Sequence, residues 1–481
     1  MNRRMVLSMI GKVVLVEAAL LLLPLFVSIG YKNDCILAFL ITIAVAVVIG
    51  LALSLFFKPK HKGVYAKDGF VIVAFSWLFL SAIGALPFVI SGEIPSYIDA
   101  FFETVSGFTT TGASILDDVE AMSEGLLFWR SFTHWMGGMG VLVFVMAVIP
   151  ANSDRSIHIL RAEVPGPTFG KLVPRIADTA KILYLIYVAL TVLETILLSL
   201  GDMNLFESVV HAFGTAGTGG FGIKGDSVGG YSGYSQWIIT IFMLVFGINF
   251  NLYYLILVKK IKTVFKSGEL WFYTAIVGLS TLAITLNIHR RFPDIFTAVR
   301  YAAFQVASIV STTGYSTLDF NRWPDFSKGI IFVLMFLGAC AGSTAGGFKL
   351  SRVLVLLKLI KREFRHLVHP RSVGVIKIEG KRVDEFTLKS VNAYFAIYIV
   401  CIAVVFLLIC FEPFGIETNL TAAVSCFNNV GPGFARVGPA SSYSCYSDFS
   451  KVVLSFAMLL GRLEIYPLIV AFLPSTWSKR N

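Results

Sequence analysis

Long apolar runs alternate with short polar segments along the whole chain. Two runs, over roughly residues 6–30 and 36–57, are each long enough for a helix that crosses a bilayer, which needs about 20 apolar residues. They predict an N-terminal helical hairpin over residues 1–67. Continuous apolar runs of this length indicate spanning helices rather than a barrel.

After residue 67 the pattern becomes repetitive. A long apolar run is followed by a shorter one and then by a second long run, and the shorter run covers only about half of a 30 Å hydrocarbon core. Such a short segment must re-enter on the side from which it came. The pattern predicts an all-α polytopic membrane protein of ten spanning helices. After the hairpin it has four fused helix–re-entrant helix–helix repeats, over residues 68–165, 166–266, 267–385 and 386–481.

The predicted elements of each repeat follow from the same runs. The first helices cover roughly 69–91, 181–200, 270–288 and 390–411. The re-entrant segments cover roughly 96–108, 204–214, 294–310 and 417–428, and acids or asparagine gather at their outer starts, as a helix N-terminus favours. The return helices cover roughly 126–149, 235–258, 328–360 and 450–473.

Each re-entrant segment ends in a turn of glycine and small residues. The turns are Thr109-Thr110-Thr111-Gly112-Ala113, Thr218-Gly219-Gly220-Phe221, Ser311-Thr312-Thr313-Gly314-Tyr315 and Asn429-Val430-Gly431-Pro432-Gly433-Phe434. Their marker glycines, Gly112, Gly220, Gly314 and Gly431, recur at intervals of roughly 100 residues, which suggests four repeats around one axis.

The turns suit an ion filter built from backbone carbonyls. Such a filter needs consecutive carbonyls that face one line in place of the water shell of an ion. Glycine adopts the unusual backbone angles that this requires at little cost. The alternative interpretation is four unrelated glycine-containing loops.

Composition and charge place the chain in a membrane. Of 481 residues, 56% are hydrophobic and 14% are charged, whereas a soluble domain has about 25% charged residues. The six cysteines lack metal-ligand spacing and do not predict a disulfide framework. The net charge of +11 gathers in clusters at 58–67, 155–181, 259–266 and 358–389. By the positive-inside rule these clusters and both termini are cytoplasmic, the turns face outside, and nucleic-acid binding is not needed to explain the charge.

Two departures from regularity mark the return helices. The run Leu337-Gly338-Ala339-Cys340-Ala341-Gly342-Ser343-Thr344-Ala345-Gly346-Gly347 predicts a non-helical intramembrane loop across the pore, and close helix packing through small residues is the alternative. Arg462, in Gly461-Arg462-Leu463-Glu464, is costly at mid-membrane and should face a polar loop; the alternative is that it snorkels to the cytoplasm. His134, in a glycine-rich string, has no partners in the sequence that would support catalysis or metal binding.

Other acids leave two interpretations open. Asp117, Asp118, Glu120 and Glu124 lie in the first outer segment, which has no Lys or Arg. An acidic mouth would concentrate cations, and ordinary solvated loop acids are the alternative.

Together these residues resemble the Trk/Ktr/HKT potassium-transporter superfamily, and within it the bacterial TrkH-type subunits. The resemblance covers the N-terminal hairpin, the four turns, the glycine-rich run of the third repeat and Gly461-Arg462-Leu463-Glu464. The strings His134-Trp135-Met136-Gly137-Gly138-Met139-Gly140 and Ala162-Glu163-Val164 with Gly166-Pro167 also look like those of the family.

The resemblance implies a potassium-selective, ion-translocating subunit that is not an enzyme. K⁺ is then the transported ion, and no organic cofactor is expected on this chain. Potassium would be bound by Thr110, Thr111, Gly112, Thr218, Gly219, Gly220, Thr312, Thr313, Gly314, Asn429, Val430 and Gly431. The gate would comprise Gly338, Ala341, Gly342, Ser343, Thr344, Gly346, Gly347 and Arg462. The register of the second and fourth turns is the least regular part of this carry-over.

The resemblance also implies partners and a location. It implies a homodimer with one pore per protomer, in contact with lipid of the bacterial inner membrane. It further implies a cytosolic, nucleotide-binding regulatory subunit of the RCK/KTN type, similar to TrkA, docked on the basic face.

Two other functions remain open at this stage. Sodium or mixed-cation transport on the same fold is the first, and the filter glycines argue against it. A membrane-embedded enzyme is the second, and it would need acids, His or Cys that converge inside the membrane. Proton-coupled, sodium-coupled and uncoupled flux are all compatible with these residues.

Overall fold

The computed structural model describes residues 1–58, 66–140, 176–372, 374–378 and 381–477 of the chain. Its regular structure is almost entirely helical, which confirms the predicted fold class; the strands in the described part are β1 (Lys377–Ile378) and β2 (Lys381–Arg382), paired antiparallel. Among the described residues, six helices are long and apolar enough to cross a membrane, or eight if each of two bent helix pairs counts as one span.

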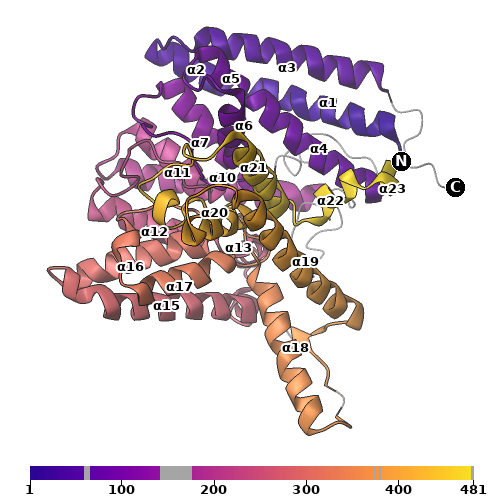
Figure 1. Cartoon of the computed structure of the whole chain (residues 1–481), viewed down its shortest axis with the longest axis vertical. Helices are drawn as coiled ribbons and strands as arrows, with labels where there is room; N and C mark the ends of the chain where they lie inside the picture. The colour runs from indigo at the N-terminus through magenta and orange to yellow at the C-terminus, as the bar shows by residue number, and fades with distance from the viewer. Residues whose placement is uncertain (59–65, 141–175, 373, 379–380, 478–481) are drawn as a thin grey trace.

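The N-terminal hairpin lies at one edge of the molecule. It comprises α1 (Arg3–Leu20), α2 (Leu22–Tyr31) and α3 (Ile36–Phe56), with α1 and α3 side by side (Figure 1). The two helices pack closely because Gly11 and Gly50 face each other, and a Cβ on Gly11 would lie less than 3.0 Å from the Gly50 carbonyl oxygen. The two ends of the chain also meet, since Arg3 donates a hydrogen bond of 3.2 Å to the Trp477 carbonyl oxygen.

Four units follow, each with a long first helix, a short helix and a return helix. Unit 1 has α4 (Ala66–Gly84), α5 (Leu86–Ser91), α6 (Tyr97–Phe108) and α7 (Glu124–Gly138); unit 2 has α10 (Ile176–Ser199), α11 (Leu205–Gly217), α12 (Gly233–Phe246), α13 (Phe250–Leu257) and α14 (Ile261–Val264). Unit 3 has α15 (Gly268–Ile288), η1 (His289–Arg291), α16 (Ile295–Val310), η2 (Phe320–Arg322), α17 (Asp325–Phe336) and α18 (Leu350–Val368). Unit 4 has α19 (Glu385–Ile409), α20 (Ile416–Asn428), η3 (Ala435–Val437), α21 (Asp448–Arg462), α22 (Tyr466–Phe472) and α23 (Pro474–Trp477).

The short helices α6, α11, α16 and α20 begin close to the predicted positions. Asn204 and Glu207 form a reciprocal capping box at the start of α11, and the Asp294 side chain accepts from the Thr297 N–H at the start of α16. Such caps satisfy backbone N–H groups that have no partner inside the helix. The local sequence therefore fixes where these helices start.

The four units close into a ring. The return helix of each unit contacts the short helix of the next: α7 contacts α11, α12 contacts α16, α17 contacts α20, and α21 contacts α6. Because the last contact joins unit 4 to unit 1, the four short helices surround a common centre.

The return helices are less continuous than the sequence predicts. Only the third is predicted to be interrupted, and it is non-helical between Phe336 and Leu350. The structure adds a bend of 90° between α12 and α13 and one of 120° between α21 and α22. The return helix of unit 1, α7, ends at Gly138, and residues 141–149 of the predicted helix lie outside the described part. Three other features of the sequence analysis also lie outside it: the predicted boundary at 165/166, the Ala162-Glu163-Val164 string and much of two basic clusters.

Both unexpected bends have local causes. The Asn249 side chain caps the start of α13 by accepting a hydrogen bond of 2.9 Å from the Asn251 N–H. Just before it, the Gly247 carbonyl accepts from the Cys340 N–H of unit 3. In unit 4, Glu464 and Ile465 have positive φ angles of 55° and 66°, and Pro467 opens α22. A positive φ is a strained conformation for a β-branched residue, so this bend is held by its surroundings.

Candidate functional site

The four turns share one backbone conformation. At the end of each short helix one residue is left-handed, with φ of 54° at Thr110, 56° at Thr218, 59° at Thr312 and 56° at Asn429. Two residues later the marker glycine also has a positive φ, between 76° and 97°. Thr218 and Asn429 therefore occupy the same positions as Thr110 and Thr312, which gives the register of the second and fourth turns.

Hydrogen bonds within each unit hold this conformation. The N–H before each marker glycine donates to the carbonyl oxygen five residues earlier. The four bonds are Thr111 to Ser106 (2.9 Å), Gly219 to Gly214 (2.8 Å), Thr313 to Ser308 (2.8 Å) and Val430 to Ser425 (2.9 Å). This is the bond of a Schellman-type helix ending, in which a left-handed residue satisfies the last carbonyls of a helix.

The marker glycines join the turns into a closed ring. A Cβ on each would lie less than 3.0 Å from a carbonyl oxygen of the neighbouring turn. The pairs are Gly112 with Gly219, Gly220 with Thr313, Gly314 with Val430, and Gly431 with Thr111. Glycine is therefore required at each of these positions for two reasons: the positive φ and the close approach of two backbones.

The ring separates an outer cavity from the loop of unit 3. A cavity of about 210 Å³ is lined by all four marker glycines and by residues of the outer segments, including Asp117 and Lys224. In the ring itself, the Thr110 hydroxyl and the Asn429 amide oxygen are buried and have no hydrogen-bond partner among the described residues. The Asn429 oxygen faces Gly346 and Gly461, so it lies on the side of the ring where the unit 3 loop and α21 pack.

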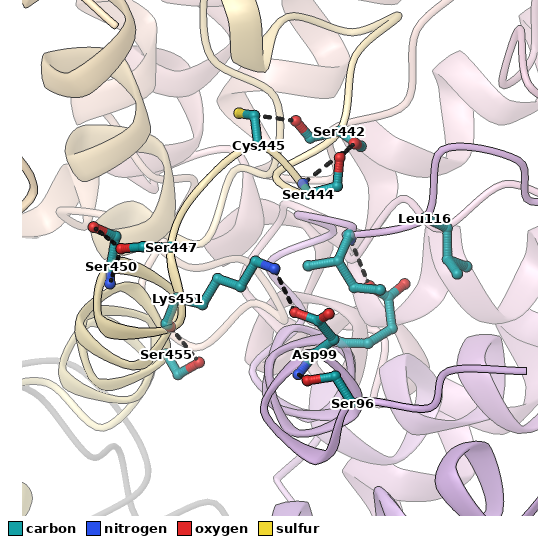
Figure 2. Close-up of polar contacts among 12 residues, drawn as sticks. Ser96, Asp99, Leu116, Ser442, Ser444, Cys445, Ser447, Ser450, Lys451 and Ser455 are labelled. Atoms are coloured by element: carbon teal, nitrogen blue, oxygen red, sulfur yellow. Dashed lines mark hydrogen bonds and ion pairs between the residues drawn. The ribbon is translucent and has the colours of Figure 1, made fainter. Parts of the chain in front are cut away.

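The outer segments are fastened to one another by their acids. The Asp99 carboxylate on α6 receives the Lys451 ammonium of α21 at 2.5 Å, as Figure 2 shows. Asp117 accepts hydrogen bonds from the hydroxyls of Ser442 and Ser444, and Glu120 accepts one from the Gly225 N–H. The acids of the first outer segment thus contact units 2 and 4, whichever interpretation of the acidic mouth applies.

The unit 3 loop, defined here as residues 337–349, lies directly against the ring. The Gly346 N–H donates to the Thr312 hydroxyl at 2.7 Å, and a Cβ on Gly346 would lie less than 3.0 Å from the Asn428 carbonyl oxygen. Gly342 and Gly347 have φ of 73° and 69°. The loop also closes on itself, since the Gly338 N–H donates to the Phe348 carbonyl oxygen at 3.0 Å.

Several bonds tie this loop to other units. From unit 2, the Phe250 N–H donates to the Gly342 carbonyl at 3.0 Å, and the Gly247 carbonyl accepts from the Cys340 N–H at 3.1 Å. The Thr344 hydroxyl donates to the Phe246 carbonyl at 3.3 Å. These bonds use the backbone groups that the bend between α12 and α13 releases.

Arg462, at the end of α21, contacts two other places where a return helix stops. Its guanidinium donates to the Thr344 carbonyl at 2.8 Å, to the Gly138 carbonyl at 3.0 Å and to the Gly137 carbonyl. The contacted carbonyls belong to the unit 3 loop and to the end of α7. The side chain therefore links units 4, 3 and 1 at the depth where their return helices stop.

The structure brings together every sequence-predicted site residue. The twelve turn residues form the ring, and the eight loop and arginine positions lie on one side of it. Sequence reasoning missed Glu269, whose carboxylate accepts the Ala341 N–H at 2.8 Å, and the ion pair between Arg352 and Glu464 at 2.5 Å. The one signal for Glu269 in the sequence is that an acid begins an apolar run. The ion pair has no local signal, because its residues are 112 positions apart.

The fold and the ring define a class: a multi-pass helical membrane protein whose four similar units surround a common centre. Comparison with known proteins then gives the family. The sequence profile of the TrkH family, described as cation transport protein, matches residues 36–480, and the chain belongs to this family.

Named relatives and a solved structure agree over the full length. The Trk system potassium uptake protein TrkH of Escherichia coli K12 is 34% identical, with 99% of this chain and 100% of that protein covered. The TrkH of Halomonas elongata is 31% identical, with both chains covered completely. The crystal structure of the potassium transporter TrkH from Vibrio parahaemolyticus is 31% identical, with a TM-score of 0.89 over 99% of this chain and 100% of that one.

Proposed function

We propose that the chain is the potassium-selective, ion-translocating subunit of a Trk-type uptake system. The observation that carries the proposal is the closed ring of four turns, in which every marker glycine meets a carbonyl of the next unit. Filters of potassium channels use rings of backbone carbonyls in place of hydration water. The names of the relatives, Trk system potassium uptake proteins, support the choice of ion.

The turn residues would hold the ion. Backbone carbonyls and hydroxyls of Thr110, Thr111, Thr218, Gly219, Thr312, Thr313, Asn429 and Val430 would be its ligands, with the marker glycines shaping the ring. Left-handed threonines support this assignment, because strained residues concentrate at functional sites. The four short helices end at the ring, so their partially negative C-terminal ends would favour a cation there.

The unit 3 loop and Arg462 would form the gate. The loop lies against the ring, and most of the bonds that tie it to residues outside the loop go to other units, so these bonds break together when those units move. α18 leaves the loop and projects from the rest of the molecule (Figure 1), so movement of α18 would pull on the loop. A gate needs a bias of only a few kcal/mol to switch.

The basic C-terminal half of α18 would receive the partner. Lys358, Lys361, Arg362 and Arg365 lie on the projecting helix, which suits an acidic face on a cytosolic, nucleotide-binding regulatory subunit of the RCK/KTN type. We further propose a homodimer in the bacterial inner membrane with both termini cytoplasmic, which the contact between Arg3 and Trp477 supports because it puts the two ends on one side.

Ion flux through the purified chain in vesicles tests the proposal. We expect K⁺ flux that exceeds Na⁺ flux, with and without imposed proton or sodium gradients to show any coupling. Equal flux of Na⁺ and K⁺ would instead indicate a mixed-cation transporter of the same fold. Catalytic turnover without ion flux would indicate the membrane-enzyme alternative.

A further inference from the structure

Phe221, the residue after the second marker glycine, contacts two polar side chains of α7, Arg130 and His134. The Arg130 guanidinium carbon lies 3.5 Å from the centre of the Phe221 ring, and the His134 ring centre lies 4.1 Å from it. All three residues are at most 4% exposed. Arg130 and His134 are four positions apart, so they project from the same face of the helix.

The same two side chains also bind the backbone of the second turn. The His134 Nε2 accepts from the Phe221 N–H at 3.3 Å, and the Arg130 guanidinium donates to the Gly222 carbonyl at 2.9 Å. From unit 3, the Tyr315 hydroxyl donates to the Phe221 carbonyl at 3.3 Å. The backbone on the outer side of Gly220 is therefore fixed by side chains of two neighbouring units.

His134 is occupied on both ring nitrogens. Its Nδ1 contacts the Gly107 carbonyl at 2.8 Å, at the end of α6. Because a carbonyl only accepts and an amide only donates, the ring must be neutral with its proton on Nδ1. This arrangement leaves no lone pair for a metal and explains why the sequence shows no catalytic partners for His134.

Arg130 is neutralised inside the protein. Its Nε lies 2.6 Å from the Glu103 carboxylate, and both side chains are nearly inaccessible. Glu103 also accepts from the Ser114 hydroxyl and the Ile115 N–H, each at 2.9 Å. One buried cluster thus joins the chain leaving the first turn to the chain leaving the second.

We propose that Arg130 and His134 are positioning residues that set ion selectivity by fixing the second turn through Phe221. The inference rests on the filter proposed above. A ring of carbonyls discriminates between ions only if its carbonyls keep their number and spacing. The second turn has the two adjacent glycines Gly219 and Gly220, so it has the least intrinsic stiffness of the four and depends most on external support.

The test compares the K⁺/Na⁺ permeability ratio of single variants in vesicles. Phe221→Leu removes the stacked ring, and His134→Phe keeps a ring but removes both nitrogen contacts. We expect each to lower the ratio by about tenfold, while His134→Gln, whose amide can donate and accept, restores much of it. A purely structural role would lower the yield or the flux of both ions without changing their ratio.

Phe213→Leu is the matched control. Phe213 lies on α11 and packs against the rings of Phe128, Phe132 and Trp135 of α7 in tilted and edge-on geometries, so it supports the same helix pair away from the turn. We expect its ratio to stay at the wild-type value. An equal fall in this variant would overturn the inference, because general packing would then explain the effect.

A reference variant separates this inference from the filter itself. If Gly314→Ala lowers the ratio but Phe221→Leu and His134→Phe do not, the positioning role is wrong and the filter stands. If none of the three changes the ratio, the filter assignment fails. Should Phe221→Leu not fold, the double variant Glu103→Gln/Arg130→Gln removes both buried charges together, and an unchanged ratio there would equally overturn the inference.

Discussion

The ring of turns and the unit 3 loop are both non-helical, and they differ in the backbone hydrogen bonds that connect each of them to its own unit. Each turn is closed by bonds to its own short helix, such as Thr313 to Ser308. The loop has bonds within itself, and it is tied to the rest of the protein by Phe246, Gly247, Phe250, Glu269, Thr312 and Arg462, of which only Glu269 and Thr312 belong to its own unit.

This difference has a mechanical consequence. When units shift relative to one another, a turn keeps its bonds to its own helix, but the loop loses bonds that cross between units. The same physical chemistry thus makes one region stiff and the other switchable. The proposed filter and gate require this combination of a stiff ring and a loop that can move.

The largest effect is expected from the loop. Deleting residues 341–346, or changing Arg462 to Ala, removes the bonds that hold the loop against the ring. We expect K⁺ flux without any partner to rise roughly tenfold or more, which corresponds to about 1.4 kcal/mol in the gating equilibrium. Vesicle flux of the purified variants measures this.

The control for the loop experiment is Arg436→Ala, which removes an exposed arginine of η3. Its flux should match the wild type. Wild-type flux in the deletion, with the protein folded and inserted, would show that the loop does not gate the pathway.

A second prediction concerns the ring. Gly314→Ala adds a Cβ that clashes with the Val430 carbonyl at a φ of 86°. We expect the K⁺/Na⁺ permeability ratio to fall about tenfold, with a stability loss of roughly 1–3 kcal/mol. Gly329→Ala, in α17 of the same unit, has no atom within 4 Å of the new Cβ and is the matched control. An unchanged ratio in Gly314→Ala would remove Gly314 from the filter.

The comparison also explains what the sequence could predict. The turns and short helices are locally encoded, by Thr-Thr-Gly runs and by caps at Asn204 and Asp294, so their positions were predictable. The bend between α12 and α13 and the role of Glu269 depend on groups brought together by folding. No local pattern marks them, and the sequence analysis missed both.

The contacts of Arg462 were predictable only in part. Its burial cost was visible from the sequence, because a guanidinium at mid-membrane needs acceptors. The Thr344 carbonyl was among the expected acceptors, but the Gly137 and Gly138 carbonyls were not. Their availability depends on the end of α7, which the sequence predicted to continue to residue 149.

A third prediction weakens a single loop bond. Glu269→Gln replaces a charge-assisted acceptor of the Ala341 N–H with a neutral one. Since charged acceptors form hydrogen bonds roughly twice as strong, partner-free K⁺ flux should rise by about two- to fivefold, less than in the deletion. Asp325→Asn, at a side chain that is 99% exposed, should leave flux unchanged. A decrease in flux for Glu269→Gln would show that this bond holds the loop open rather than closed.

The smallest effect belongs to the outer segment of unit 4, which covers the ring from outside. The Ser447 hydroxyl, together with Ser450, donates to Glu412 and holds the pKa of this carboxyl below its ordinary value of 4.5. Because the folded-state pKa is lowered, this contribution to stability is present above the ordinary pKa and is lost as the pH falls through the folded value. Ser447→Ala should therefore lower the melting temperature at neutral pH by roughly 1 °C, and the difference from wild type should narrow as the pH falls through the lowered pKa of Glu412. The part due to the lost Ser447 cap of α21 should remain at low pH.

The same variant tests whether the fourth turn is held by its own short helix rather than by the outer segment of unit 4. Ser447→Ala loosens a segment close to the fourth turn without touching the bond from Val430 to Ser425. If the turns depend on their own helices, the K⁺/Na⁺ permeability ratio must stay at the wild-type value while the melting temperature falls. The matched control is Ser441→Ala, an exposed serine of the same outer segment, for which neither quantity should change. A lower ratio in Ser447→Ala alone would show that the outer segment supports the filter, and the contrast between a locally held ring and a loop held from other units would no longer stand.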